Sequence, residues 1–155
     1  MEKGKKGKIS LEEIKENLTN FFLGREEVLL AYLFGSSLGG KRGEKTDIDI
    51  AILIDPESFN RLDKTQPFGY EAEMISELIL LLRHNLVDLV ILNKATPLLA
   101  YQVIHNGMLL FSRSEDLRIK FEINSLKRHA DTKRLREIKS IYSRKRAGKG
   151  ISAYD

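Results

Sequence analysis

Apolar residues recur every three or four positions near the start of the chain, which is the period of a helix with one buried face. They are Leu11, Ile14, Leu18 and Phe21. Ser10 precedes them and Glu13 follows Ser10 by three residues, a pair typical of a capping box at a helix start. Gly24 is a residue type that commonly ends a helix. The pattern predicts a first helix between Ser10 and Gly24.

Four short apolar runs follow, and each has the length of a strand. They cover residues 28–34, 47–54, 86–92 and 108–112. Several of them are apolar at consecutive positions, which indicates strands buried on both faces of a sheet. The predicted fold is therefore an α/β or α+β domain with a small mixed sheet of about four strands flanked by helices.

Helical patterns separate and follow these strands. Helices are predicted over residues 71–83, over 97–106 and from 114 to about 142. The second begins with a proline behind Thr96, an N-cap residue, which is a favourable helix start. Residues 55–69 are polar and hold two of the three prolines, so a loop is predicted there.

Length and composition indicate one soluble domain. The chain has 155 residues, of which 42% are hydrophobic and 31% are charged. We expect the domain over residues 10–142, with a basic disordered N-terminus over 1–9 and a basic flexible tail over 143–155. No apolar run approaches the roughly 20 residues of a membrane span, so no membrane partner is expected. The absence of cysteine fits the cytoplasm, and the three histidines stand at no metal-ligand spacing.

The net charge of +4 is unevenly distributed. Residues 127–149 hold ten Lys or Arg and two acidic residues, whereas residues 9–126 hold 12 basic and 18 acidic residues. A basic segment of this kind is typical of a solvated helix face, of a contact with an acidic protein or of a contact with nucleic acid. The acidic middle of the chain argues against a nucleic-acid groove across the core.

The segment GSSLGGKRGEKTDIDIAIL, which begins at Gly35, joins the first two predicted strands and carries candidate chemistry. Asp47 and Asp49 stand at the start of the second strand, so their side chains are expected on one face, about 6–7 Å apart. Asp88 interrupts the apolar run of the third strand. If the second and third strands pair, three carboxylates converge on one patch.

Three carboxylates without a basic partner repel one another, and a hard cation relieves that repulsion. Mg²⁺ binds few carboxylates together with substrate phosphates, and two such ions clamp the attacking and leaving oxygens of a phosphoryl displacement. Gly35 lets the backbone approach a phosphate closely, and Ser36 offers a hydroxyl. The loop that follows adds three cations that suit a triphosphate, namely Lys41, Arg42 and Lys45.

These residues carry a resemblance to a known family. GSSLGGKRGEKTDIDIAIL, followed by VDLVILN, resembles the minimal nucleotidyltransferases of the DNA polymerase β superfamily. The similarity is greatest to the MntA-type antitoxins of HEPN/MNT toxin–antitoxin systems, whose signature is Gly-Ser, ten residues, Asp-x-Asp. The segment LNKATPLLAYQVIHNGMLLFSRSED is similar to the C-terminal half of those proteins. The resemblance covers about residues 10–142.

The resemblance implies an enzyme that transfers AMP from ATP to a tyrosine hydroxyl of a partner HEPN-domain ribonuclease toxin and silences it. Two Mg²⁺ ions are implied, and their ligands are the catalytic residues Asp47, Asp49 and Asp88. Asp88 is also implied to favour deprotonation of the attacking hydroxyl. The implied nucleotide-binding residues are Gly35, Ser36, Ser37, Lys41 and Arg42.

Two positions depart from the pattern of these relatives. Ser37 stands where many of them have arginine, and Thr46 stands where serine is common. Lys41, Arg42 or Lys45 would have to replace the phosphate contact of that arginine. The change at Ser37 favours the alternative of a non-catalytic antitoxin that neutralises the toxin by direct binding.

Two further expectations concern partners. After residue 112 the chain has room for one helix and a tail, so the acceptor is expected to be presented by another protein. A third hypothesis takes the basic segment 127–149 as a nucleic-acid contact, and it predicts salt-sensitive DNA binding. No recognition motif supports it, so nucleic acid is not the expected partner.

Overall fold

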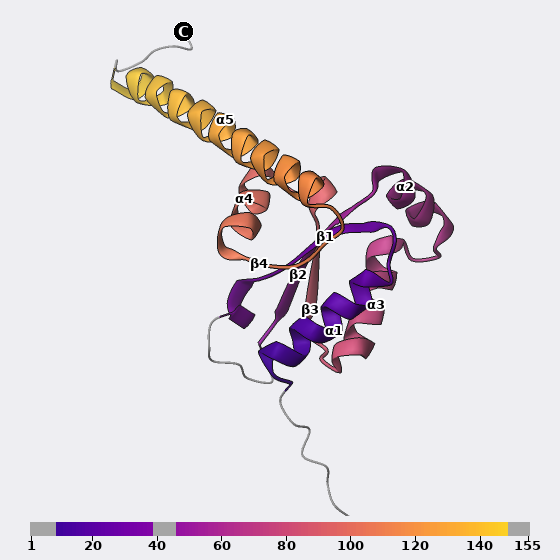
Figure 1. Cartoon of the computed structure of the whole chain (residues 1–155). Helices are drawn as coiled ribbons and strands as arrows, with labels where there is room; N and C mark the ends of the chain where they lie inside the picture. Colours follow the sequence, from indigo (N-terminus) through magenta and orange to yellow (C-terminus); the bar gives the residue numbers. More distant parts are fainter. Residues whose placement is uncertain (1–8, 39–45, 149–155) are drawn as a thin grey trace, which may run out of the picture.

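The computed structural model describes residues 9–38 and 46–148. Within them, four strands form one mixed sheet in the order β3-β2-β1-β4 (Figure 1). The strands are β1 (Val28–Phe34), β2 (Ile48–Ile54), β3 (Val87–Ile91) and β4 (Met108–Ser112). β1 runs antiparallel to β2 and β4, whereas β3 runs parallel to β2. The predicted fold class and the four predicted strands are confirmed.

Helices cover both faces of the sheet (Figure 1). They are α1 (Leu11–Leu23), α2 (Pro56–Thr65), α3 (Tyr70–Leu82), α4 (Pro97–Asn106) and α5 (Glu115–Gly148). One face packs against α1 and α3, which contribute Leu18 and Leu78 to the larger apolar cluster. The other face packs against α4 and the start of α5, where Val103 and Phe121 lie with Tyr32 of β1 in a smaller cluster. Because side chains alternate between the two faces along a strand, the strands contribute apolar residues to both clusters.

Local signals set the helix starts as predicted. The Ser10 hydroxyl oxygen accepts a hydrogen bond from the Glu13 N–H at 3.1 Å, and the Glu13 carboxylate accepts one from the Ser10 N–H at 3.3 Å. At the start of α4, the Thr96 hydroxyl oxygen accepts a hydrogen bond from the Leu99 N–H at 3.2 Å. Each cap satisfies backbone donors that have no partner inside the helix.

The loop predicted over residues 55–69 is wrong, because α2 occupies Pro56–Thr65. The Asp55 carboxylate accepts hydrogen bonds from the Ser58 N–H at 3.1 Å and from the Ser58 hydroxyl at 2.9 Å. Proline is favoured at the first helical position behind such a cap. α2 has no fully buried residue, and Phe59 and Leu62, which pack half-buried against the larger apolar cluster, are too few to give the apolar period that reveals a helix.

The last helix is longer than predicted, since α5 ends at Gly148 and not near Tyr142. Residues 143–148, expected in a flexible tail, are helical, and the Arg and Lys residues among them are good helix formers. Ile9, placed by the prediction in the N-terminal segment 1–9, packs half-buried against the larger apolar cluster, and residues 1–8 and 149–155 lie outside the described residues. In the part of the chain that the structure describes, no helix combines the length and the apolar character that a membrane crossing requires.

A side chain from the turn after β3 holds the end of β2. Asn93, in the short 3-10 turn η2 (Leu92–Lys94), accepts a hydrogen bond from the Ile54 N–H at 2.9 Å and donates one to the Ile54 carbonyl at 2.7 Å. Ile54 is fully buried. The amide side chain thus continues the parallel pairing of β2 and β3 beyond the last strand residue.

We predict that Asn93→Ala lowers the free energy of unfolding by about 1–3 kcal/mol, because it leaves two buried backbone groups of Ile54 without partners. Urea unfolding followed by circular dichroism measures the change. Asn124→Ala, on an exposed position of α5, is the matched control and should not lower stability. Equal urea midpoints for the two variants would contradict the prediction.

Candidate active site

The parallel pairing of β2 and β3 brings two of the three predicted carboxylates together. Asp49 and Asp88 are register partners, so their side chains leave neighbouring strands on the same face of the sheet. Asp47 lies two residues before Asp49, just ahead of β2. Asp49 is half-buried, and Asp47 is exposed. The pairing of the second and third strands, on which the expected convergence of the carboxylates depends, is confirmed.

Asp88 differs from the expectation in one respect, because it is exposed and not part of a buried run. Val87, Leu89 and Ile91 are buried on one face of β3, whereas Asp88 opens to solvent on the other. The reason is topological: β3 is an edge strand of the sheet. An exposed carboxylate of this kind stays hydrated in the folded protein, so it is accessible to a ligand and carries no cost of burial.

The three carboxylates form a concentration of negative charge. Burial raises the pKa of the Asp49 carboxyl above its ordinary range, and the negative charges of Asp88 and then Asp47 raise this pKa further. Among residues 9–38 and 46–148, no lysine or arginine forms an ion pair with any of the three. In the same residues, no group of three or more His, Cys, Asp or Glu side chains is placed so that it could hold a metal ion as the structure stands. Within the described residues, therefore, the charge of these carboxylates has no ion-pair partner.

The Gly-Ser turn lies directly against Asp49. Phe34, the last residue of β1, is the register partner of Asp49, and the 3-10 turn η1 (Gly35–Leu38) follows. Gly35 has φ +78°, a left-handed conformation, and a Cβ on it would stand 2.9 Å from Cγ of Asp49. Both the backbone conformation and the close approach require glycine at this position.

The remaining predicted nucleotide-binding residues are less fully described. Ser36 is exposed in η1, next to Gly35. The backbone of Ser37 belongs to the same turn, while its side chain is outside the described part of the chain. Lys41 and Arg42, like Lys45, lie outside the described residues. The structure thus brings Gly35 and Ser36 to the same strand ends as the carboxylates.

One positioning residue escaped the sequence analysis. Nε2 of His84, which follows α3, lies 2.7 Å from the carbonyl oxygen of Thr46, and since a carbonyl only accepts, Nε2 carries the hydrogen. The Ile48 N–H also donates to the Leu86 carbonyl at 2.8 Å. These two bonds hold both neighbours of Asp47 against the segment that leads into β3. No spacing in the sequence signals a contact of this kind.

The sequence matches a protein-family model. Residues 16–116 match the family described as polymerase beta, nucleotidyltransferase. The matched segment contains η1, β2 and β3, and so includes Gly35, Ser36, Asp47, Asp49 and Asp88.

Individual relatives point in the same direction. The chain is 28% identical over 108 residues to a protein adenylyltransferase MntA of Aphanizomenon flos-aquae, which covers 69% of this chain and 72% of the relative. A chain in a crystal structure of a toxin–antitoxin complex with AMP-PNP has 25% identity and a TM-score of 0.60, over 83% of this chain and 98% of that one.

A second solved structure shows the shared fold. It contains a tri-AMPylated HEPN toxin of Shewanella oneidensis in complex with an MNT antitoxin, and it matches with 23% identity and a TM-score of 0.52. The match covers 83% of this chain and 98% of that chain.

We predict that Asp49→Asn raises the melting temperature of the metal-free protein at neutral pH. The raised pKa means that the folded state binds the Asp49 proton more tightly than the unfolded state. The contribution of this carboxyl to stability is therefore complete below its unfolded pKa of about 3.9 and is lost as pH rises through the folded pKa. Differential scanning fluorimetry from pH 4 to pH 8 should show that the difference in melting temperature between Asp49→Asn and the wild type grows as pH rises.

The control for this experiment is Glu16→Gln, which neutralises an exposed carboxylate on α1. The melting temperature of this variant relative to the wild type should not rise comparably with pH. A lower melting temperature for Asp49→Asn at neutral pH would contradict the prediction.

We predict that Gly35→Ala lowers the free energy of unfolding by about 1–2 kcal/mol, the cost of a Cβ in the left-handed region, and displaces the Asp49 carboxylate. Gly24→Ala is a matched control, since Gly24 has φ −82° and a Cβ there would make one ordinary contact, 3.6 Å from the Phe21 carbonyl oxygen. Urea unfolding compares the two variants. Equal stability of both would show that the turn tolerates a side chain.

Proposed function

Since the chain belongs to the polymerase β nucleotidyltransferase family, we propose that it is an antitoxin that transfers AMP from ATP to a tyrosine hydroxyl of a HEPN-domain toxin. The observation that carries the proposal is the pairing of Asp49 with Asp88 beside the Gly35 turn. A phosphate-binding turn and a carboxylate cluster thus lie at one end of the sheet, as the transfer of a nucleotide requires. Because the donor is ATP, the reaction belongs in the cytoplasm.

The chemistry of the donor set fits Mg²⁺. Carboxylate oxygens are its preferred protein ligands, and Mg²⁺ usually takes one or two carboxylates together with phosphate oxygens and water. A cluster whose charge has no cation partner among the described residues suits this role. Asp47, Asp49 and Asp88 would hold two ions. When bound, Mg²⁺ neutralises the triphosphate and makes its phosphorus more electrophilic.

The residues of the chain then act on the substrates as follows. The backbone of Gly35 and the hydroxyl of Ser36 bind triphosphate oxygens, and Ser37, Lys41 and Arg42 complete this contact. The tyrosine oxygen of the toxin forms a bond to the α-phosphorus of ATP while the bond to pyrophosphate breaks. Asp88 accepts the phenolic proton. Most of the rate enhancement comes from positioning and charge neutralisation.

The relatives support a protein acceptor. The similar MntA is described as a protein adenylyltransferase, and a similar fold occurs beside an AMPylated HEPN toxin. The exposure of Asp47, Asp88 and Ser36 leaves the cluster open to a second protein. This supports the expectation that the toxin brings the acceptor to the site.

Ser37 favours a second candidate function, an antitoxin that neutralises the toxin by contact without AMP transfer. Its position is held by arginine in many relatives, so this chain lacks one phosphate contact unless a loop cation supplies it. The two candidates differ in a single observable, the mass of the toxin after incubation.

We predict that the wild-type protein, incubated with Mg²⁺ and ATP, adds the mass of AMP to the toxin. The toxin to be tested is the product of the neighbouring gene. Asp47→Ala and Asp49→Ala should each slow this addition by at least about a hundredfold, since each removes a ligand of the Mg²⁺ that would neutralise negative charge in the transition state. Intact-mass spectrometry measures the addition, and Glu16→Gln is the control with full activity. Modification by the alanine variants at the wild-type rate would refute the enzymatic proposal, and binding without any mass gain would support contact alone.

A further inference from the structure

The C-terminal part of α5 leaves the body of the protein. We call residues 131–148 the arm; it projects beyond α4 as an isolated helix (Figure 1). Every residue from 133 to 148 is exposed. At 1.5 Å per residue this exposed part extends about 24 Å. The family model ends at residue 116, so the arm is not part of the matched domain.

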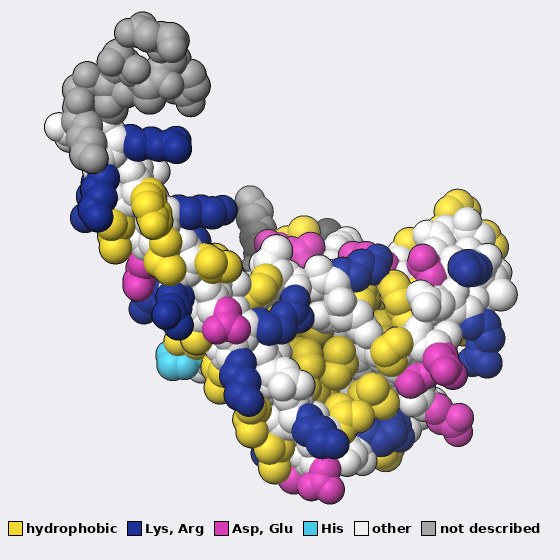
Figure 2. Space-filling view, turned by 90° about the horizontal axis from the view of Figure 1, so that it is seen from above, with side chains coloured by type: hydrophobic (Ala, Val, Ile, Leu, Met, Phe, Trp, Pro, Cys, Tyr) yellow, Lys and Arg dark blue, Asp and Glu magenta, His cyan; other side chains and the backbone are white. Residues whose placement is uncertain are grey.

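The arm carries an apolar stripe that nothing in the described chain covers. Leu135, Ile138 and Tyr142 are 59%, 40% and 65% exposed, and their spacing of three and seven residues places them on one face of the helix. Ile141, 51% exposed, lies beside them. Figure 2 shows apolar and basic side chains mixed along this helix. A helix of this length without packing is marginal in water, so a partner for the stripe would stabilise it.

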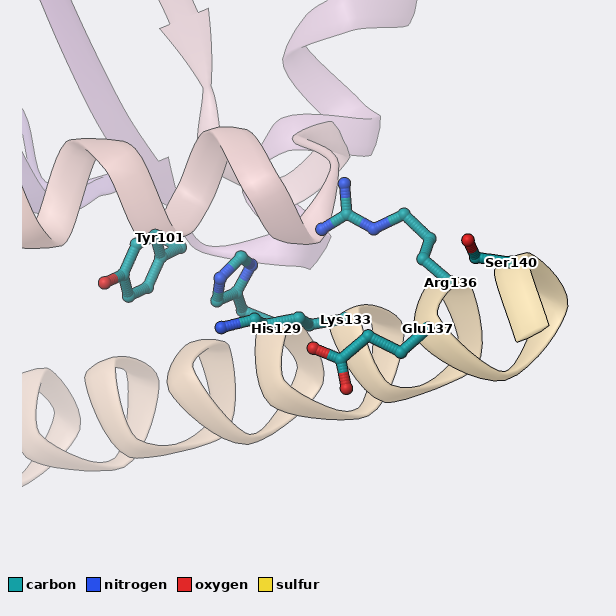
Figure 3. A pocket seen from close by; sticks show the side chains of 6 residues that line it. All are labelled: Tyr101, His129, Lys133, Arg136, Glu137 and Ser140. Carbon is teal, nitrogen blue, oxygen red and sulfur yellow. The ribbon is translucent and has the colours of Figure 1, made fainter. Parts of the chain in front are cut away.

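The stripe faces away from the body of the protein. The opposite side of the helix forms an open groove of about 560 Å³ with α4 (Figure 3). The groove is lined by Tyr101, His129, Lys133, Arg136, Glu137 and Ser140. The ring of Tyr101 stacks on that of His129 with centroids 4.0 Å apart, which fixes the rotation of the helix at the base of the arm. Tyr142 follows Ser140 by two residues and therefore points to the opposite side.

The charge of the arm indicates which partner fits. The arm holds two acidic residues, Asp131 and Glu137, and seven basic residues, namely Lys133, Arg134, Arg136, Lys139, Arg144, Lys145 and Arg146. No ion pair among the described residues involves any of them. Two copies of the arm would repel each other, which disfavours a second copy of this chain. An exposed apolar stripe suits a protein surface better than a nucleic-acid backbone.

We propose that the arm docks on an acidic, apolar surface of a partner protein, with Leu135, Ile138 and Tyr142 as apolar anchors and the flanking cations as its complementary charge. On the proposed function, which this inference rests on for the identity of the partner, that protein is the toxin. Apolar anchors supply affinity at such interfaces, and the basic flanks speed association and fix orientation. The arm thus holds the toxin while the carboxylate cluster acts on it.

The test uses the full chain and the product of the neighbouring gene. Leu135→Glu combined with Ile138→Glu replaces two anchors by acidic residues, and Glu is itself a good helix former. Leu80→Glu is the matched control, because Leu80 is 79% exposed on α3, away from the arm. Titration calorimetry should show binding weakened at least tenfold by the double substitution and unchanged by the control. Circular dichroism verifies that helix content is retained.

A second variant tests the charge. Reversal of Arg144, Lys145 and Arg146 to glutamate should weaken binding to the gene product and reduce the dependence of binding on salt. Wild-type affinity of both arm variants overturns the inference, as does a wild-type chain that fails to bind. If the arm variants lose binding to a DNA duplex and still bind the toxin, the inference is overturned in favour of a nucleic-acid contact. A dimer of the chain alone that the double variant abolishes overturns it in favour of a second copy.

The outcome is separable from that of the proposed function. Intact-mass analysis of the same wild-type mixture reports AMP transfer independently of affinity. Arm-dependent binding without transfer would sustain the docking inference and refute the enzymatic proposal. AMP transfer together with toxin binding that the arm substitutions leave unchanged would refute the docking inference and sustain the enzymatic proposal.

Discussion

Repulsion among three carboxylates is the physical constraint on which the site depends. Parallel pairing of β2 with β3 places Asp49 beside Asp88, and Asp47, two residues before Asp49, adds its negative charge. Burial raises the pKa of the Asp49 carboxyl, and the negative charges of Asp88 and Asp47 raise this pKa further. The fold sustains this arrangement because apolar contacts on both faces of the sheet fix the strands. A cation between the carboxylates would turn the repulsion into binding energy.

Gly35, which follows β1, lies directly against the Asp49 carboxylate on the neighbouring strand β2. β1 ends beside Asp49, and the turn that follows is so close that a side chain at Gly35 would overlap the carboxylate. Antiparallel pairing of β1 with β2 and parallel pairing of β2 with β3 therefore meet at one residue, Asp49. A short sheet of four strands is therefore sufficient to place the Gly-Ser turn and the carboxylates at one end of the sheet.

Apolar runs and caps made much of the fold predictable from the sequence. The strands and the start of α1 were predictable because short apolar runs and the Ser10–Glu13 pair act locally. α2 was missed because its two large apolar residues, Phe59 and Leu62, are too few to show the helical period, and the polar segment 55–69 with its two prolines favoured a loop. The exposure of Asp88 and the contact of His84 with Thr46 depend on which strand lies at the edge and on tertiary packing, which no local pattern encodes.

The most direct test of the account is the position of the metal. Crystals of the protein grown with Mn²⁺ in place of Mg²⁺ and with a non-hydrolysable ATP analogue would locate it by anomalous scattering. The account predicts anomalous peaks within coordination distance of the Asp47 and Asp49 carboxylates, with Asp88 beside them and the triphosphate against Gly35 and Ser36. Metal and nucleotide bound elsewhere, or nucleotide at this site without metal, would contradict it.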